Sequence, residues 1–231
     1  MAKILFVMTG ADQWTLADGS THPTGFWAEE ATVPYGAFKA AGHEITVATP
    51  GGVVPPVDPV SLSAEANGGE EKAAGVRGVV EGAAEFRSPV AVADVRLDDF
   101  DAVYVPGGHG PMEDLAVDVD SGRLLARAVE SGMLVGVVCH GPAALLAATK
   151  DDGANAYAGY RITAFTNTEE RLAGHAEKAK WLLQDRLTEA GLKVEVGEPW
   201  APHIEADRNL VTGQNPASSG PLAAELLKRL G

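Results

Sequence analysis

Short runs that are apolar at every position restrict the fold of this chain more than any other feature. Three such runs are Ile4–Met8, Ala102–Val105 and Met133–Val138. Strands buried on both faces of a parallel sheet have this unbroken pattern, whereas half-exposed strands alternate apolar and polar residues. We therefore predict that these runs form a parallel sheet covered on both sides.

Segments with helical spacing separate the apolar runs. Glu29–Ala41, Gly122–Ser131 and Ala176–Ala190 each stop at a glycine, which is a common signal for the end of a helix. Alternation of strand and helix favours a doubly wound α/β fold of the flavodoxin type, mostly parallel, in one domain covering residues 1–231. Further predicted elements are the strands Glu44–Thr49, Arg161–Phe165, Lys193–Val196 and Leu210–Thr212, and a closing helix at Gly220–Leu230.

One stretch, residues 51–94, does not follow this alternation. It is rich in Pro, Gly, Ala and charged residues, and its periodicity is weak. We interpret it as an insertion or cap, a loop with a small helix that covers a site.

Charge and composition exclude several classes of function. The chain has 231 residues and a net charge of -14, which argues against binding to nucleic acid or to an anionic membrane surface. No apolar stretch approaches the 18 residues or so that a membrane-spanning helix needs. The single cysteine rules out an internal disulfide and suits a reducing compartment, so we expect a cytoplasmic protein.

The strongest signal for chemistry is the segment from Gly136 to Pro142. A predicted buried strand ends at Cys139, Gly141 follows, and Pro142 fits the first position of a helix. This is the pattern of a nucleophile elbow, a sharp turn that exposes a side chain at the carboxyl edge of the sheet. The following helix is expected to lower the pKa of the thiol. The alternative is that Cys139 is simply a small buried residue.

Three histidines are candidates for the base that activates Cys139. His140 is its neighbour in sequence, His109 follows another strand in a Gly-Gly-His-Gly segment, and His203 begins a His-Ile-Glu segment that ends at Glu205. The last arrangement is typical of glutamine amidotransferases. The residues alone leave all three open.

Five segments in this order resemble the ThiJ/PfpI (class I glutamine amidotransferase-like) superfamily, and more closely its heat-shock-protein-31-like or glyoxalase III branch. They are Pro23–Glu30, Pro106–Gly110, Val138–Pro142, Ile162–Glu170 and Leu210–Ser218. The resemblance implies that Cys139, His140 and Glu170 form a triad and that Glu30 is an acid beside the sulfur. It implies an oxyanion-binding loop at Gly107 and Gly108, completed by the backbone of His140.

The same resemblance implies a function. Methylglyoxal would be converted to lactate through a Cys139 hemithioacetal, without a cofactor or a metal ion, and the enzyme would be a homodimer acting on a small dicarbonyl substrate. The alternatives are a holding chaperone with a redox-sensing cysteine, an amidase or peptidase, and a protein deglycase. Nucleotide binding has no support, because no Gly-x-Gly-x-x-Gly follows the first strand.

Overall fold

The computed structural model describes all 231 residues and is built around a seven-stranded sheet. The strand order is β10-β11-β7-β6-β1-β4-β5. The strands are β1 (Lys3–Val7), β4 (Glu44–Thr49), β5 (Val90–Ala91), β6 (Ala102–Val105), β7 (Leu134–Val138), β10 (Ile204–Asp207) and β11 (Leu210–Gly213). Every neighbouring pair is parallel except β10 with β11.

The order of the parallel strands identifies the fold type. Taken along the chain, β1, β4, β6, β7 and β11 lie in the spatial order 2-1-3-4-5, the arrangement of flavodoxin-like sheets. The middle strands are apolar and almost wholly buried, as their unbroken patterns predicted. The predicted α/β class and mostly parallel sheet are therefore confirmed, and the carboxyl ends of β1, β6 and β7 meet at one edge.

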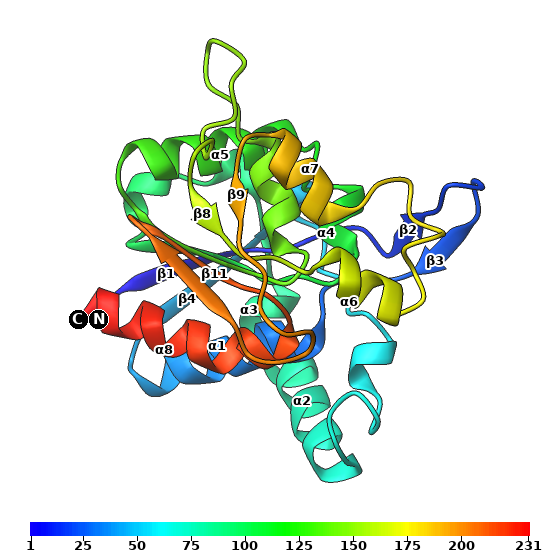
Figure 1. Cartoon of the computed structure of the whole chain (residues 1–231). Coiled ribbons are helices and arrows are strands. Elements are labelled where there is room, and N and C mark those ends of the chain that lie inside the picture. Colours follow the sequence, from blue (N-terminus) through cyan, green and yellow to red (C-terminus); the bar gives the residue numbers. More distant parts are fainter.

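Helices cover both faces of the sheet (Figure 1). Helices α1 (Ala28–Ala40) and α8 (Ser219–Leu230) pack side by side on one face, and α5 (Val119–Glu130) and α7 (Leu183–Glu189) lie on the other. Helix α5 buries Leu124, Leu125 and Ala128. The remaining helical elements are α2 (Glu70–Gly82), α3 (Ala84–Arg87), α4 (Gly110–Glu113), α6 (Asn167–Leu172) and the short turns η1 (Pro50–Gly52), η2 (Val60–Leu62), η3 (Val92–Asp94), η4 (Leu97–Asp99), η5 (Gly141–Ala147) and η6 (Pro216–Ser218).

One expectation in the C-terminal third was wrong and two predicted strands are shorter than expected. The predicted helix over Ala176–Ala190 is helical only from Leu183, because its first residues turn back and the N–H groups of His175 and Ala176 bond to the carbonyl of Glu170. The predicted strands Arg161–Phe165 and Lys193–Val196 are present over their first residues and lie outside the central sheet. They form a separate parallel pair, β8 (Arg161–Ile162) with β9 (Lys193–Val194).

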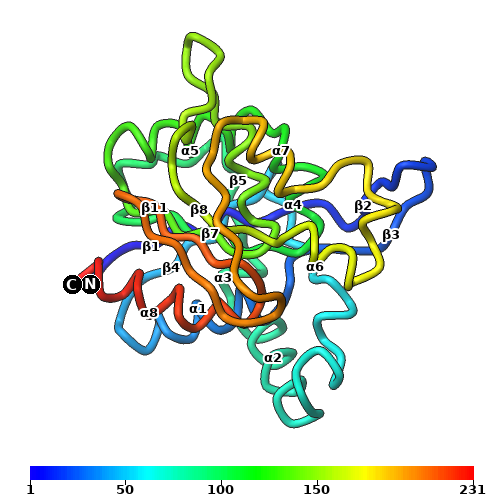
Figure 2. The backbone as a smooth tube through the Cα atoms, in the orientation of Figure 1, coloured from blue at the N-terminus to red at the C-terminus, as the bar shows by residue number.

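Residues 51–94 contain more regular structure than their sequence pattern suggested. Helix α2 has 13 residues and packs against α1, and the segment returns to the sheet edge as β5. In Figure 2 this segment, drawn from cyan to green-blue, extends away from the sheet and comes back to it. Only Ala73 of α2 is buried, so no apolar stripe marks this helix in the sequence.

A hairpin near the N-terminus was also not predicted. Strands β2 (Gln13–Thr15) and β3 (Thr21–Pro23) pair with each other and project from the body of the molecule (Figure 1). They are three residues each, too short for a periodicity to be recognised. Separately, none of the helices has the length and apolar character that crossing a membrane requires.

Candidate active site

Cys139 lies at the carboxyl end of β7 in a left-handed backbone conformation, with φ of 58°. This conformation is uncommon for a residue other than glycine, and it is held here by hydrogen bonds on both sides. The Cys139 N–H donates to the carbonyl of Gly213 at 2.8 Å, and its carbonyl accepts from Phe165 N–H at 2.9 Å. The sharp turn expected from the sequence is therefore present, with the 3-10 turn η5 following it.

Two glycines allow the neighbouring loops to approach this turn. A Cβ on Gly141 would lie 2.5 Å from the carbonyl oxygen of Val105. A Cβ on Gly107 would lie 2.6 Å from the backbone nitrogen of His140 and 2.7 Å from a carboxylate oxygen of Glu30. Since real side chains do not tolerate such contacts, both positions require glycine.

His140 connects the cysteine to a carboxylate. Its Nδ1 lies 3.3 Å from Cys139 Sγ, and its Nε2 lies 2.7 Å from Oε2 of Glu170. All three side chains are buried. A hydrogen-bonded nucleophile, base and orienting acid is the arrangement that activates a thiol or hydroxyl nucleophile. The structure thus brings together the three residues that the family resemblance named.

The first turn of α6 determines where Glu170 points. Thr166 caps this helix by accepting from the Glu169 N–H, and the Glu169 side chain accepts from the Thr166 N–H in return. This capping box fixes the start of the helix. It turns the Glu169 carboxylate back toward the cap and leaves that of Glu170 facing the histidines.

A second histidine also contacts Glu170. His109 Nε2 lies 2.9 Å from Oε1 of Glu170, and the imidazole ring packs 4.2 Å from that of His140. Burial alone would raise the pKa of Glu170, but the charge of His140 and hydrogen bonds from both rings hold it well below its ordinary value. Sequence reasoning considered His109 only as an alternative to His140. His109 and His140 face the same carboxylate because they follow the neighbouring strands β6 and β7.

Glu30 is wholly buried on α1, next to the sulfur. Its Oε2 accepts from Gly107 N–H at 2.7 Å, while Oε1 has no nitrogen or oxygen partner. Burial raises the pKa of Glu30 to about 8, although hydrogen bonds to Cys139 and Gly107 act in the opposite direction. At neutral pH this carboxyl therefore holds a proton that it can donate to the sulfur. Its neighbour Glu29 is half-buried and lines the pocket instead.

The environment of Cys139 corrects one expectation. Burial raises the pKa of its thiol, the negative charge of ionised Glu30 raises it further, and only the N–H of Gly108 lowers it. The predicted lowering of the thiol pKa by a following helix is therefore wrong, because burial outweighs it. A proton on Glu30 removes the repulsion and converts this contact into one that favours thiolate.

Two backbone N–H groups near the sulfur make no hydrogen bond to a protein oxygen. Neither Gly108 nor His140 donates its N–H to a protein oxygen, and the Gly108 N–H faces the sulfur. Gly108 has a φ of 88°, and a Cβ there would lie 2.3 Å from the Gly25 carbonyl. Paired donors next to a nucleophile that are not bound to a protein oxygen can stabilise a developing oxyanion.

These groups open into a pocket of about 620 Å³. Aromatic, histidine and acidic side chains line the pocket, and residues between 58 and 66 contribute to its lining. The lining residues are His22, Trp27, Glu29, Asp58, Val60, Ser63, Glu65, Ala66, Gly108, His109, Cys139, His140, Phe165, Ala173, His175, Trp200, Asn215, Pro216 and Ala217. No lysine or arginine is among them.

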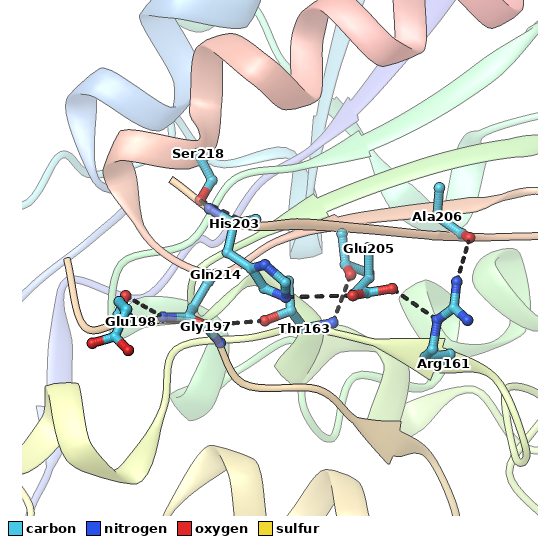
Figure 3. A network of polar contacts seen from close by, with 10 residues as sticks. Arg161, Thr163, Gly197, Glu198, His203, Glu205, Ala206, Gln214 and Ser218 are labelled. Atoms are coloured by element: carbon cyan, nitrogen blue, oxygen red, sulfur yellow. Dashed lines mark hydrogen bonds and ion pairs between the residues drawn. The ribbon is translucent and has the colours of Figure 1, made fainter. Parts of the chain in front are cut away.

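The structure does not bring His203 to the cysteine. Figure 3 shows its ring beside Glu205, with Nε2 3.4 Å from Oε1, in a network that also includes Arg161 and Gln214. The amidotransferase-like arrangement of Cys139, His203 and Glu205 is therefore not formed, because His140 occupies the position next to the sulfur.

One group could hold a metal ion by geometry. His109, His140 and Glu170 offer ligand atoms that all lie within 4.8 Å of one another. Both oxygens of Glu170 already accept from an imidazole, so each of those ring nitrogens carries a proton. A metal ion would have to displace both protons, and the arrangement fits a hydrogen-bonded acid–base group better.

The chain is similar to several known proteins along most of its length. The chain is 29% identical to the protein/nucleic acid deglycase HchA of Staphylococcus aureus over 95% of its length and 77% of that protein. The Rapid Encystment Protein of Francisella tularensis matches with a TM-score of 0.85 and 25% identity, covering 100% of both chains. Glyoxalase III of Candida albicans has the same fold, with a TM-score of 0.80 and 23% identity over 98% of this chain and 96% of that one. The model of the DJ-1/PfpI family matches residues 22–229, and the chain belongs to that family, as its five segments predicted.

Proposed function

We propose that this protein is a glyoxalase that converts methylglyoxal to lactate with Cys139 as its nucleophile and with no cofactor. The observation that carries the proposal is the buried, hydrogen-bonded Cys139–His140–Glu170 line. Cys139 Sγ lies 3.3 Å from His140 Nδ1, and His140 Nε2 lies 2.7 Å from Glu170 Oε2. The protonated Glu30 beside the sulfur supplies the hydrogen bond that a buried thiolate needs.

The chemistry follows from these positions. His140 Nδ1 takes the thiol proton as Cys139 Sγ adds to the aldehyde carbon. The N–H groups of Gly108 and His140 stabilise the alkoxide until it regains a proton, which gives a hemithioacetal. Moving the hydrogen from C1 to C2 through an enediol gives a thioester. Hydrolysis of that thioester releases lactate and restores the thiol, so the sum is methylglyoxal plus water to lactate.

Two similarities support this choice of reaction. The Candida albicans structure with the same fold is a glyoxalase III, and the curated relatives at 29% identity are protein/nucleic acid deglycases. Both names concern dicarbonyl compounds or the adducts that they form. The elbow, the paired N–H groups and the buried acid fit addition of a thiolate to a carbonyl.

The test is lactate formation from methylglyoxal, without glutathione or added metal, by the wild type and by Cys139→Ala. We expect lactate from the wild type alone, with both proteins showing the same circular dichroism spectrum and thermal midpoint within a few degrees. Wild-type protein that forms no lactate, or a Cys139→Ala variant that forms it at a substantial rate, would refute the proposal.

A specific feature favours deglycation as a second candidate. The pocket of about 620 Å³ exceeds what a three-carbon substrate fills, and it carries Glu29, Asp58 and Glu65 with no lysine or arginine. Such a wall suits the adduct of methylglyoxal with an amine or guanidine side chain. Release of lactate from a purified arginine adduct, in the presence of an excess of a scavenger for free methylglyoxal, would distinguish this activity from the first. No release under those conditions would exclude it.

A further inference from the structure

The proposed reaction needs a base that Cys139 and its two nearest partners do not supply. His140 Nδ1 takes the thiol proton and returns it to the alkoxide, and in the next step it is needed to move that proton from the C1 oxygen to the C2 oxygen. Glu30 already holds a proton at neutral pH, because burial raises its pKa to about 8. The hydrogen on C1 must therefore be accepted by another group.

His109 lies in the same pocket and is held there by contacts on two sides. Its Nε2 bonds to Oε1 of Glu170 at 2.9 Å, and its ring lies 4.2 Å from that of His140. On the other side, the ring of Trp14 stacks on it at 4.2 Å with an angle of 18° between the planes. The side chain is 13% exposed and lines the same pocket as Cys139.

The hydrogen bonds fix the tautomers of both rings. Glu170 is ionised and can only accept, so His109 and His140 each carry a proton on Nε2 and have a free lone pair on Nδ1. For His140 that lone pair faces Cys139 Sγ. For His109 the Nδ1 makes no hydrogen bond within the protein.

The two histidines also differ in charge during the reaction. Burial lowers the pKa of His109, and a positive charge on His140 lowers it further, although hydrogen bonding to Glu170 acts against this. When His140 becomes an imidazolium, His109 therefore stays neutral and able to accept a proton. One carboxylate thus orients two imidazoles of which only one is charged at a time.

We propose that His109 is a second catalytic base, whose Nδ1 takes the proton from C1 of the Cys139 hemithioacetal and returns it to C2. This assignment rests on the glyoxalase function proposed above. The C1–H bond breaks, its electron pair forms the C1–C2 double bond, and His140 carries the proton of the C1 hydroxyl group to the C2 oxygen. Return of the proton to C2 leaves a C2 hydroxyl group, and C1 regains its carbonyl as the thioester.

The experiment compares His109→Gln with His203→Gln, a histidine variant outside the pocket. Glutamine at 109 keeps a donor for Glu170 but cannot act as a base. Two readouts are measured: kcat for lactate formation, and the rate at which iodoacetamide alkylates Cys139, the only cysteine. Alkylation reports on the Cys139–His140–Glu170 line without requiring glyoxalase turnover.

We expect kcat of His109→Gln to fall roughly 10²- to 10⁴-fold, the range for loss of a general base, while alkylation stays within about threefold of the wild type. The residual turnover should show a larger isotope effect with methylglyoxal deuterated at C1. A parallel fall of kcat and alkylation would overturn the assignment and leave His109 a positioning residue for Glu170. A kcat within about threefold of His203→Gln would overturn it as well. Wild-type protein that forms no lactate would refute the glyoxalase function itself, and this assignment with it.

Discussion

Glu169 and Glu170 are neighbours in sequence, yet their carboxylates face opposite parts of the molecule. Oε2 of Glu170 lies 2.7 Å from His140 Nε2, whereas Oε1 of Glu169 lies 2.8 Å from Nδ2 of Asn215. The α-helical turn places successive side chains about 100° apart, so one acid serves the candidate active site and the other the C-terminal segment. This separation makes their substitutions distinguishable.

Replacing Glu169 should mainly reduce stability. Its fully buried carboxylate accepts hydrogen bonds from Thr166, Trp200, Gln214 and Asn215. Glu169→Ala leaves those donors without an acceptor, so we expect the free energy of unfolding to fall by roughly 3–5 kcal/mol. Urea unfolding followed by circular dichroism measures this. A loss below about 1 kcal/mol would contradict the structural role.

Replacing Glu170 by glutamine should instead reduce activity. The amide oxygen can accept from one imidazole, but the NH₂ group faces the N–H of the other. We expect kcat for the proposed reaction to fall roughly 10²- to 10⁴-fold, with alkylation of Cys139 by iodoacetamide slowed as well. Glu169→Gln, which keeps most of its acceptor contacts, is the matched control and should retain most activity. Equal activity in the two variants would argue against the orienting role.

The buried Glu30 predicts a pH dependence of stability. Burial raises its pKa from 4.5 to about 8, so between these values the folded protein holds a proton that the unfolded chain has released. The contribution of Glu30 is therefore complete below about pH 4.5 and is lost as the pH rises through 8. Its neighbours Glu29 and Asp58 act in the same direction through their charge.

The isosteric variant Glu30→Gln isolates this effect, because it cannot ionise. Its thermal midpoint relative to the wild type should rise steadily from pH 5 to pH 8, corresponding to a change on the order of 3–5 kcal/mol. Differential scanning calorimetry at several pH values measures the difference. A difference that does not change with pH would show that Glu30 ionises in the folded state as it does in the unfolded chain.

Two glycine substitutions should differ in their effect on the active site: Gly107→Ala should damage it and Gly36→Ala should leave it intact. In Gly107→Ala the new methyl group would lie within 2.7 Å of the His140 nitrogen and of Glu30 Oε2, so we expect a fall of at least about tenfold in the rate of Cys139 alkylation. In Gly36→Ala, on helix α1, the methyl group meets nothing within 4 Å. That variant should keep full activity and gain up to about 1 kcal/mol from helix propensity. Normal alkylation in Gly107→Ala would show that the loop shifts without cost.

The local pattern of the sequence determined the sheet and the position of the nucleophile. Unbroken apolar runs identified β1, β6 and β7, since strands buried on both faces cannot alternate. The combination of a strand end, Gly141 and Pro142 located the turn at Cys139, which has the left-handed backbone expected of an elbow. Likewise, the resemblance of five segments named the family to which the chain belongs.

Only the tertiary structure decided which side chains meet. Apart from the family resemblance, which named His140, the residues left three histidines open for the base. The distance between Cys139 and His109 or His203 depends on how strands pair. The adjacency of β6 and β7 brings His109 to the second oxygen of Glu170, and the antiparallel β10–β11 pair directs His203 toward Glu205. The length of helix α2 and the start of α7 were missed for the same reason: long-range contacts, rather than local periodicity, determine where these helices begin and end.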